Sequence, residues 1–333
     1  MTAASRPSGP ASSPVDERAF HAWLARALPA GSGGLLPLGD DAAALELPRG
    51  SVAVVSTDAL VEGTHFLRSS PPRLVGRAAS AVSLSDVAAK GATPLAVFLA
   101  LVVPRGSPRA WAERLVLAAE AEAARFGAHV LGGDTKPGPR RTVVSTVVGA
   151  APRSRLVGRM GARPGDALVT TGEVGRGGAA ALALHATGTP RRRAVAGLLQ
   201  VRPRVREGLV LARYAHAMLD TSDGIAESAR LLASASGVRV VVVEGALPLA
   251  VPVRRIRSVA RRRAAAFYGG DYELLAAVPP GRLRVAARAV RELGGRLTRI
   301  GSVARGSGAV LLTDRGTEPM PEAGWRPFPR GSR

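Results

Sequence analysis

Hydrophobic and polar positions along the chain alternate between short apolar runs of strand length and longer stretches with helical spacing. Residues 51–56 are short and rich in β-branched side chains, which predicts a buried strand. Residues 74–90 follow a Pro pair and end at Gly91, which is typical of a helix. The same signals predict further strands at 95–103, 128–131, 142–148, 167–171, 215–219, 238–243, 274–278 and 309–313, and further helices from Ser107, at 179–186, at 225–236 and at 283–293.

This alternation predicts an α/β (α+β) protein of two domains. A basic connection over 151–163 ends in the turn Pro164-Gly165-Asp166, after which the pattern restarts. We therefore expect an N-terminal domain over 15–151 and a C-terminal domain over 152–333. Residues 1–14 are small and polar, which predicts a disordered leader. The pattern does not define the order of the strands.

The composition excludes several classes of site. The chain has 333 residues, which suits two domains, and no cysteine, which rules out disulfides, cysteine metal sites and thiol nucleophiles. The N-terminus lacks the apolar core of a signal peptide. The apolar stretch 78–103 contains Asp86, Lys90 and Pro94, so it does not suit a membrane span. We expect a soluble cytoplasmic protein with no membrane partner.

The net charge of +21 at first suggests a polyanionic partner. Only Lys90 and Lys136 are lysines among the 46 basic residues, and Ala, Gly and Pro are also abundant, which is typical of a GC-rich genome. A nucleic-acid-binding protein is the alternative from a different class, supported by the arginine clusters at 191–193 and 261–263. Aromatic residues make up only 4% and no nucleic-acid motif is present, so we expect no specific nucleic-acid partner.

The aspartates are more informative than the basic residues. Any single Asp beside Gly or Ser is commonly a turn or helix-cap residue. A set of them in an acid-poor chain favours Mg²⁺-dependent phosphate chemistry, because Mg²⁺ binds carboxylates together with phosphate oxygens and glycine lets backbone N–H groups approach phosphates. Eight of the eleven aspartates have Gly, Ser or Thr neighbours: Asp40, Asp41, Asp58, Asp86, Asp134, Asp220, Asp223 and Asp271.

Other catalytic designs lack their motifs. Neither lysine stands in a GxxxxGK[ST] loop, the HRD and DFG elements of protein kinases are absent, and no GxSxG elbow occurs. The five histidines form no HExxH pair, which argues against a zinc protease.

Eight sequence motifs, in the order in which they stand along the chain, resemble those of a known family. They are GDDAA (39–43), STDALVEGTHF (56–66), AVSLSDVAAKGATP (81–94), LGGDTK (131–136), GRMGARPGD (158–166), LDTSDGIAESARLL (219–232), GGDYELL (269–275) and GW (324–325). With them the chain resembles the thiamine-monophosphate kinases of bacteria and archaea, in the superfamily of aminoimidazole ribonucleotide synthetase and selenophosphate synthetase.

The resemblance implies a two-domain synthetase-like fold, in which the N-terminal sheet domain joins a second subunit in a barrel and the C-terminal α/β domain completes the active site. It further implies a homodimer, with ATP as co-substrate and Mg²⁺ as cofactor. The reaction would be direct transfer of the γ-phosphoryl group of ATP to thiamine monophosphate, giving thiamine diphosphate, with no covalent enzyme intermediate.

The resemblance also assigns roles to residues. It implies catalytic roles for Asp58, Asp86 and Asp220, ATP contacts at Gly133, Asp134, Arg159 and Ser222, and substrate contacts at His65 and Trp325. The implied magnesium ligands are Asp41, Ser56, Thr57, Asp58, Asp86, Asp134, Asp220 and Asp223.

One position departs from the family pattern. The family commonly has GGEDYEL, and its Glu contacts the substrate, whereas Gly270 stands at that place in this sequence. The departure leaves open an alternative, a related ATP-dependent enzyme of the superfamily that acts on a different phosphate or carboxylate substrate.

Overall fold

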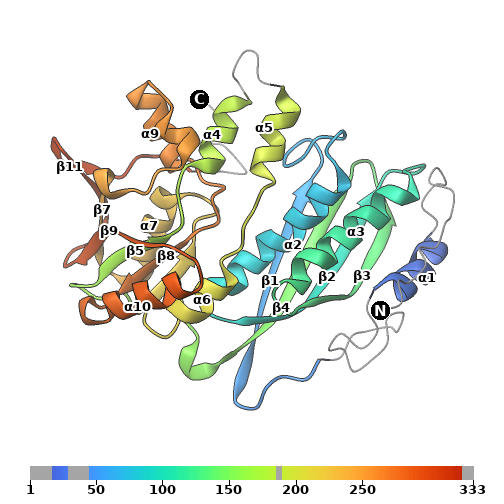
Figure 1. Cartoon of the computed structure of the whole chain (residues 1–333), viewed down its shortest axis with the longest axis horizontal. Coiled ribbons are helices and arrows are strands. Elements are labelled where there is room, and N and C mark those ends of the chain that lie inside the picture. The colour runs from blue at the N-terminus through green and yellow to red at the C-terminus, as the bar shows by residue number, and fades with distance from the viewer. Residues whose placement is uncertain (1–16, 29–44, 185–189, 325–333) are drawn as a thin grey trace.

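The computed structural model describes residues 17–28, 45–184 and 190–324, so the predicted leader lies outside the described residues. Two sheets lie side by side, and each carries helices on at least one face (Figure 1). This arrangement confirms the predicted α/β class. The predicted division at 151/152 remains a prediction, and β4 (Thr142–Pro152) ends one residue beyond it.

The first sheet has four strands in the order β1-β4-β2-β3. Strand β4 is antiparallel to β1 and to β2, whereas β2 and β3 are parallel. Helices α2 and α3 pack against each other and cover one face of this sheet (Figure 1). The elements are α1 (Glu17–Ala27), β1 (Ser51–Val61), α2 (Pro72–Ala88), β2 (Thr93–Val103), α3 (Arg109–Ala124) and β3 (His129–Pro137).

None of the described helices covers the opposite face of this sheet, and we call it the open face. Side chains alternate between the two faces of a strand, and in β1 Val55 is 61% exposed whereas Leu60, which points to the helices, is 6% exposed. The open face carries Ala53, Val55, Thr57 and Ala59 of β1 and, by strand register, Val144, Thr146, Phe98, Ala100 and Asp134.

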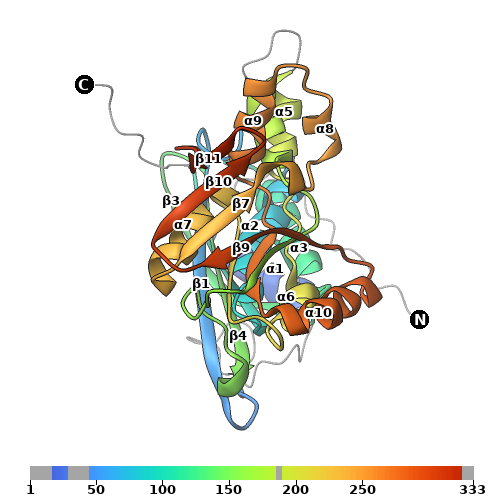
Figure 2. The ribbon, with the colours of Figure 1, turned by 90° about the vertical axis from the view of Figure 1, so that its left-hand side faces the viewer.

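The second sheet has the order β11-β10-β7-β9-β5-β8-β6 and is mostly antiparallel, with β7 and β10 parallel. Figure 2 views the molecule from this side, with β7, β9 and β10 in front of the first sheet. Its strands are β5 (Ala167–Thr171), β6 (Ala217–Asp220), β7 (Arg239–Val243), β8 (Leu274–Val278), β9 (Leu297–Ala304), β10 (Gly308–Thr313) and β11 (Gly316–Pro319).

Helices surround the second sheet. Helix α7 packs against β6, β7 and β10, α10 packs against β9 and α6, and α4 contacts α5, α8 and α9. Their bounds are α4 (Arg176–Ala183), α5 (Arg191–Leu198), α6 (Val205–Leu211), α7 (Ile225–Ser236), α8 (Val251–Arg254), α9 (Val259–Phe267) and α10 (Pro280–Glu292), with short 3₁₀ turns at Arg153–Arg155 and Glu244–Ala246.

The two halves meet along α2. This helix contacts β6 and α6 of the second half, and the Ser85 hydroxyl donates to Asp220 Oδ2 at 2.7 Å. Seventeen residues of mostly small side chains make α2 narrow enough to be buried between the halves, and most of its residues are inaccessible to solvent. Helix α2 therefore places one end of the first sheet beside the ends of β6 and β8.

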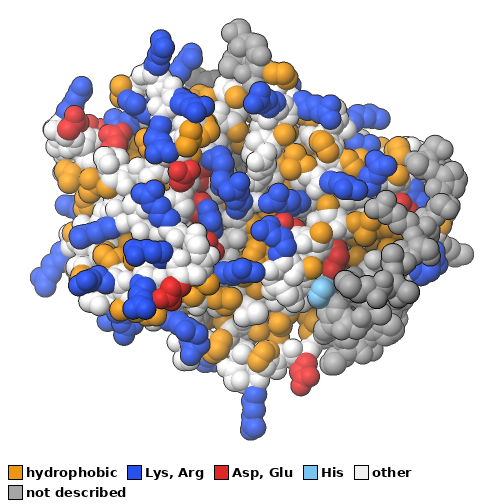
Figure 3. All heavy atoms as spheres, in the orientation of Figure 1, with side chains coloured by type: hydrophobic (Ala, Val, Ile, Leu, Met, Phe, Trp, Pro, Cys, Tyr) orange, Lys and Arg blue, Asp and Glu red, His pale blue; other side chains and the backbone are white. Residues whose placement is uncertain are grey.

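The basic residues are spread over the surface. On the face in Figure 3, Lys and Arg side chains are scattered over both halves of the molecule instead of gathering in one patch. Within the described ranges, none of the helices has both the length and the hydropathy that crossing a membrane requires.

Candidate active site

Carboxylates from both halves converge on one cleft of about 280 Å³. Asp58 lies on β1, Asp86 lies near the end of α2, Asp220 ends β6 and Asp223 lies in the turn before α7. The cleft wall also includes three other predicted residues, His65, Ser222 and Gly270. The structure thus brings together seven residues that the sequence motifs had singled out far apart along the chain.

Hydroxyl groups orient these carboxylates. Ser56 Oγ donates to Asp86 Oδ2 at 2.5 Å, and Ser222 Oγ donates to Asp220 Oδ1 at 3.1 Å. Because Ser85 donates to the other oxygen of Asp220, both oxygens of that carboxylate already accept a hydrogen bond. A residue of α2 in the first half therefore fixes a carboxylate of the second half.

The electrostatics of the cleft favour protons on these groups. Burial, with the neighbouring charges of Asp86 and Asp220, raises the pKa of Asp58 to about 7. Burial and Asp86 likewise raise the pKa of Asp220 to about 6, against hydrogen bonds from Ser85 and Ser222 that lower it. Full ionisation of the cluster requires compensating positive charge.

The donor set fits Mg²⁺. Within the described ranges, no three His, Asp or Glu side chains are close enough to hold one metal ion by themselves. Mg²⁺ does not need such a cage, because it typically takes one or two carboxylates and completes its shell with water and substrate phosphate oxygens. Pairs of carboxylates drawn from Asp58, Asp86 and Asp220 would hold Mg²⁺ in this cleft.

The raised pKa values predict a pH dependence of stability in the metal-free protein. Asp58 has a pKa of about 7 when folded and 3.8 as a free side chain, so between these values the folded state binds more protons than the unfolded state. Its contribution to stability is therefore full below pH 4 and is lost as the pH rises through 7. In EDTA, the Tm of the wild type minus the Tm of Asp58→Asn should decrease as the pH is raised from 5 to 8. A difference in Tm that stays constant over this range contradicts the assignment.

Two cations border the cleft. Burial and the charge of Glu227 raise the pKa of Asp223, and the exposed Arg159 opposes this rise. The Lys90 ammonium donates to the Met218 carbonyl at 3.3 Å, and burial and Arg159 lower its pKa. Arg159 is the predicted ATP contact, and its exposed side chain at the rim is accessible to phosphate groups.

His65 faces the cleft from the turn after β1. The Val61 N–H donates to His65 Nδ1 at 3.1 Å, so the proton of the neutral ring is on Nε2. Burial lowers the pKa of His65, which keeps the ring neutral. The ring is therefore a neutral donor.

Gly270 leaves space in the cleft where the family carries a carboxylate. A Cβ atom there would lie 3.5 Å from Gly177 Cα and 4.0 Å from Leu198 Cδ2, which are ordinary contacts. The backbone at Gly270 has a φ of +75°, a conformation that any residue with a Cβ adopts at a cost. The glycine therefore widens this part of the cleft and removes one negative charge from it.

Three predicted ligands lie away from the cleft. Thr57 is next to Asp58 in an extended strand, so it points to the open face, where its hydroxyl contacts that of Thr146. Gly133 and Asp134 lie on β3, at the opposite edge of the same sheet, and Asp134 pairs with Lys136 at 2.7 Å. Three strand spacings separate β1 from β3, or about 14 Å.

Packing explains why residue 133 is a glycine. A Cβ atom there would lie 1.9 Å from the Leu99 carbonyl oxygen, which is too close for any other residue.

Two predicted ligands, Asp41 and Trp325, lie outside the described residues. Conversely, the cleft includes side chains that the motifs did not single out. Tyr268 and Tyr272 flank Gly270, and α5 and the connection after it contribute Leu198, Leu199 and Val201. Tyr272 belongs to the GGDYELL motif, so its position next to Asp271 was the available signal.

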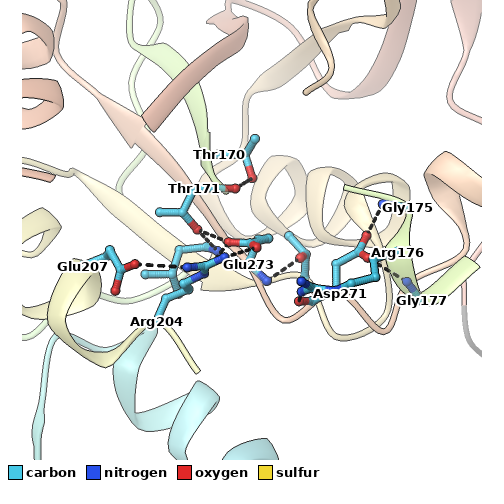
Figure 4. A network of polar contacts seen from close by, with 11 residues as sticks. Thr170, Thr171, Gly175, Arg176, Gly177, Arg204, Glu207, Asp271 and Glu273 are labelled. Atoms are coloured by element: carbon cyan, nitrogen blue, oxygen red, sulfur yellow. Dashed lines mark hydrogen bonds and ion pairs between the residues drawn. The ribbon is translucent and has the colours of Figure 1, made fainter. Parts of the chain in front are cut away.

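A buried polar network supports the wall behind the cleft (Figure 4). Arg204 donates to both oxygens of Glu273, from Nε at 2.6 Å and from a terminal nitrogen at 2.5 Å, and Thr171 donates to the same carboxylate at 2.7 Å. Asp271 accepts the N–H groups of Gly175 at 2.5 Å and Gly177 at 2.9 Å. The network holds the Asp271–Glu273 segment rigidly against the start of α4.

Comparison with known proteins adds independent support. Residues 39–151 match the model of the AIR synthase related protein, N-terminal domain, and residues 163–313 match that of the C-terminal domain. The thiamine-monophosphate kinase of Halobacterium salinarum is 37% identical over 298 residues, which cover 86% of this chain and 99% of that protein.

Solved structures agree. A thiamine-monophosphate kinase from Stenotrophomonas maltophilia superimposes with a TM-score of 0.77 at 30% identity, covering 85% of this chain and 92% of that one. The structure of AaThiL complexed with AMPPCP and TMP gives a TM-score of 0.72 at 29% identity, covering 87% of this chain and 91% of that one.

Proposed function

Because the chain belongs to the thiamine-monophosphate kinase family of AIR synthase related proteins, we propose that it phosphorylates thiamine monophosphate to thiamine diphosphate with ATP. The observation that carries the proposal is the convergence of Asp58 and Asp86 with Asp220 and Asp223 on one cleft between the two halves. AaThiL has been crystallised with AMPPCP, an ATP analogue, and TMP, and this chain covers 91% of that structure.

The residues of the cleft have distinct roles in such a phosphoryl transfer. Asp58, Asp86 and Asp220 would hold Mg²⁺, which supplies positive charge between the two phosphate groups that must approach each other. Arg159 at the rim binds and orients phosphate oxygens, and His65 donates from Nε2 to the acceptor. Phosphoryl transfer asks the protein mainly for this positioning and charge neutralisation, so no nucleophilic side chain is required.

The product assay tests the reaction and the substrate together. Purified protein is incubated with ATP, MgCl₂ and thiamine monophosphate, and thiamine diphosphate is measured by chromatography, with free thiamine as the control acceptor. We expect thiamine diphosphate from the monophosphate only. If AMPPCP binds but no thiamine diphosphate forms, the substrate assignment fails. An ATPase screen across other phosphates and carboxylates then tests the alternative that Gly270 suggests.

We further propose that the enzyme is a homodimer in which two open faces close a barrel. The open face exposes apolar side chains such as Val55, and both β1 and β3 are edge strands of the described sheet. An uncovered apolar sheet with free edges favours pairing with another chain. A two-fold axis along the barrel would set β3 of one copy beside β1 of the other, and so bring Asp134 near Thr57 across the interface.

Complementation between two inactive variants tests this dimer. Asp134→Asn and Asp220→Asn are co-expressed with different tags, and the mixed dimer is purified. If Asp134 acts on the partner's site, one of the two sites in the mixed dimer combines a native Asp134 with a native Asp220, so we expect about half of the wild-type activity. If Asp134 serves its own chain, the mixed dimer is as inactive as either parent.

A further inference from the structure

Tyr272 has an unusual backbone at the wall of the cleft. Its φ is 54°, and every other described residue with positive φ is glycine. A bulky residue is rarely found in this left-handed region, and it persists there only where the surroundings enforce it. Such strain concentrates at functional sites.

Both neighbours of Tyr272 are locked. On one side, the Asp271 carboxylate accepts two backbone N–H groups at the start of α4 (Figure 4). On the other side, Glu273 is held by Arg204 through two hydrogen bonds, and its N–H donates to Thr221 Oγ1 at 3.0 Å. The chain must pass between these two anchors in a single residue, which imposes the left-handed conformation on Tyr272.

The side chain of Tyr272 then crosses from the second half of the molecule to the first. Its ring packs against Ala81 and Val82 of α2 and against Val201. Tyr272 lines the cleft together with Asp58 and Asp86 of the first half and with Asp220 and Asp223 of the second. One phenol thus lies among the four carboxylates on which the proposed reaction depends.

The hydroxyl has no hydrogen bond to another described residue. It is also not among the buried polar atoms that lack a partner, so it is open to the cleft that Tyr272 lines. A phenol keeps its proton at neutral pH, so the group is available as a donor. A strained residue that points a protonated donor into a cleft is prepared for an acceptor that is not part of the chain.

We propose that Tyr272 is a further substrate-binding residue, whose hydroxyl donates a hydrogen bond to a non-bridging oxygen of the phosphate groups between which the phosphoryl group passes. This proposal rests on the proposed function. A phosphate oxygen is the acceptor that fits, because it must lie near the carboxylates that would hold Mg²⁺. A neutral donor suits this place better than Lys or Arg, since a cation would form ion pairs with the four aspartates and compete with the metal.

Kinetics of Tyr272→Phe provide the first test. Phe keeps the ring and its packing on α2 and removes only the hydroxyl. We expect kcat to fall by about 10- to 100-fold with the Tm unchanged and the KM for ATP changed little, as for the loss of a donor that acts on developing charge. Tyr214→Phe is the matched control, because Tyr214 packs in a separate cluster away from the cleft, and it should keep wild-type kinetics. A kcat of Tyr272→Phe within twofold of the wild type overturns the proposal.

A second readout does not depend on turnover. The chain has three tyrosines, so protein labelled with 3-fluorotyrosine gives three ¹⁹F resonances, and the one lost in Tyr272→Phe is that of Tyr272. We expect this resonance to shift when MgCl₂ and AMPPCP, or thiamine monophosphate in addition, are added. If the resonance stays in place at saturation with all three, the proposal fails. If the protein makes no thiamine diphosphate but the resonance still shifts with AMPPCP, then the proposed acceptor is wrong while the proposed role of Tyr272 stands.

Discussion

Replacing Asp220 by asparagine should lower kcat by at least about 100-fold while the fold stays intact. Asp220 receives hydrogen bonds on both oxygens, one from Ser85 of the first half and one from Ser222 beside it, so its position is fixed before substrate binds. Asp220 would act through the Mg²⁺ that it helps to hold. Loss of one group that stabilises transition-state charge typically costs about 10² to 10³ in rate, or about 3 to 4 kcal/mol. Asparagine keeps the size and an acceptor oxygen, so the loss would come from the charge.

Asp314 supplies the matched control. It lies exposed in the turn between β10 and β11, far along the sheet from β6, and Asp314→Asn makes the same chemical change. Steady-state kinetics with thermal unfolding of both variants separate an effect on the site from an effect on the fold. Asp220→Asn with more than a tenth of the wild-type kcat would show that this carboxylate is dispensable.

Replacing Arg204 by methionine should cause the largest loss of stability. Glu273 is 1% exposed, and Arg204 is its ion-pair partner, bonded to both carboxylate oxygens. Breaking a buried pair by removing one partner leaves an uncompensated buried charge and costs about 3–5 kcal/mol. In a thermal unfolding experiment this corresponds to a fall in Tm of roughly 10 °C.

The exposed pair between Arg288 and Glu292 on α10 is the control for this experiment. Its side chains are 80% and 62% exposed and are joined by one hydrogen bond at 2.9 Å, so this is an ion pair of the same type in an aqueous environment. Arg288→Met should change the free energy of unfolding by less than about 1 kcal/mol. Equal losses of Tm in the two variants would mean that burial of Glu273 contributes nothing.

The strands and helices with regular patterns could be predicted from the sequence. Strands β5 and β8 and helix α7 have the predicted bounds, because each is a short apolar run or an amphipathic stretch that ends at a glycine or proline signal. Strand β9, which lies in the middle of the second sheet, was not predicted. Its sequence LTRIGSVA places Thr298, Arg299 and Gly301 among the apolar residues and so conceals the strand pattern.

The carboxylates that line the cleft could be predicted from the sequence motifs, but their geometry could not. Residues 51–56 were expected to be a strand, whereas β1 continues to Val61 and therefore includes Thr57 and Asp58. Adjacent residues of a strand point to opposite faces, so these two neighbours cannot reach into one cleft of the same chain. Which side chains of a strand point into the cleft follows from the bounds and the register of the strand, and the motifs contain neither. Tyr272 was missed for a related reason, since its role depends on a backbone angle that tertiary contacts impose.

The scarcity of lysine gives the protein two built-in chemical reporters. Lys90 and Lys136 carry the only side-chain amines in the chain. Lys90 is half-buried behind the cleft, where it donates to the Met218 carbonyl, and the Lys136 side chain is 56% exposed beside Asp134 at the edge of the open face. Among side chains, an amine-directed reagent followed by mass spectrometry would therefore report on these two places. Protection of Lys136 at rising protein concentration would record closure of the sheet edge, and labelling of Lys90 would record separation of the two halves, without any engineered label.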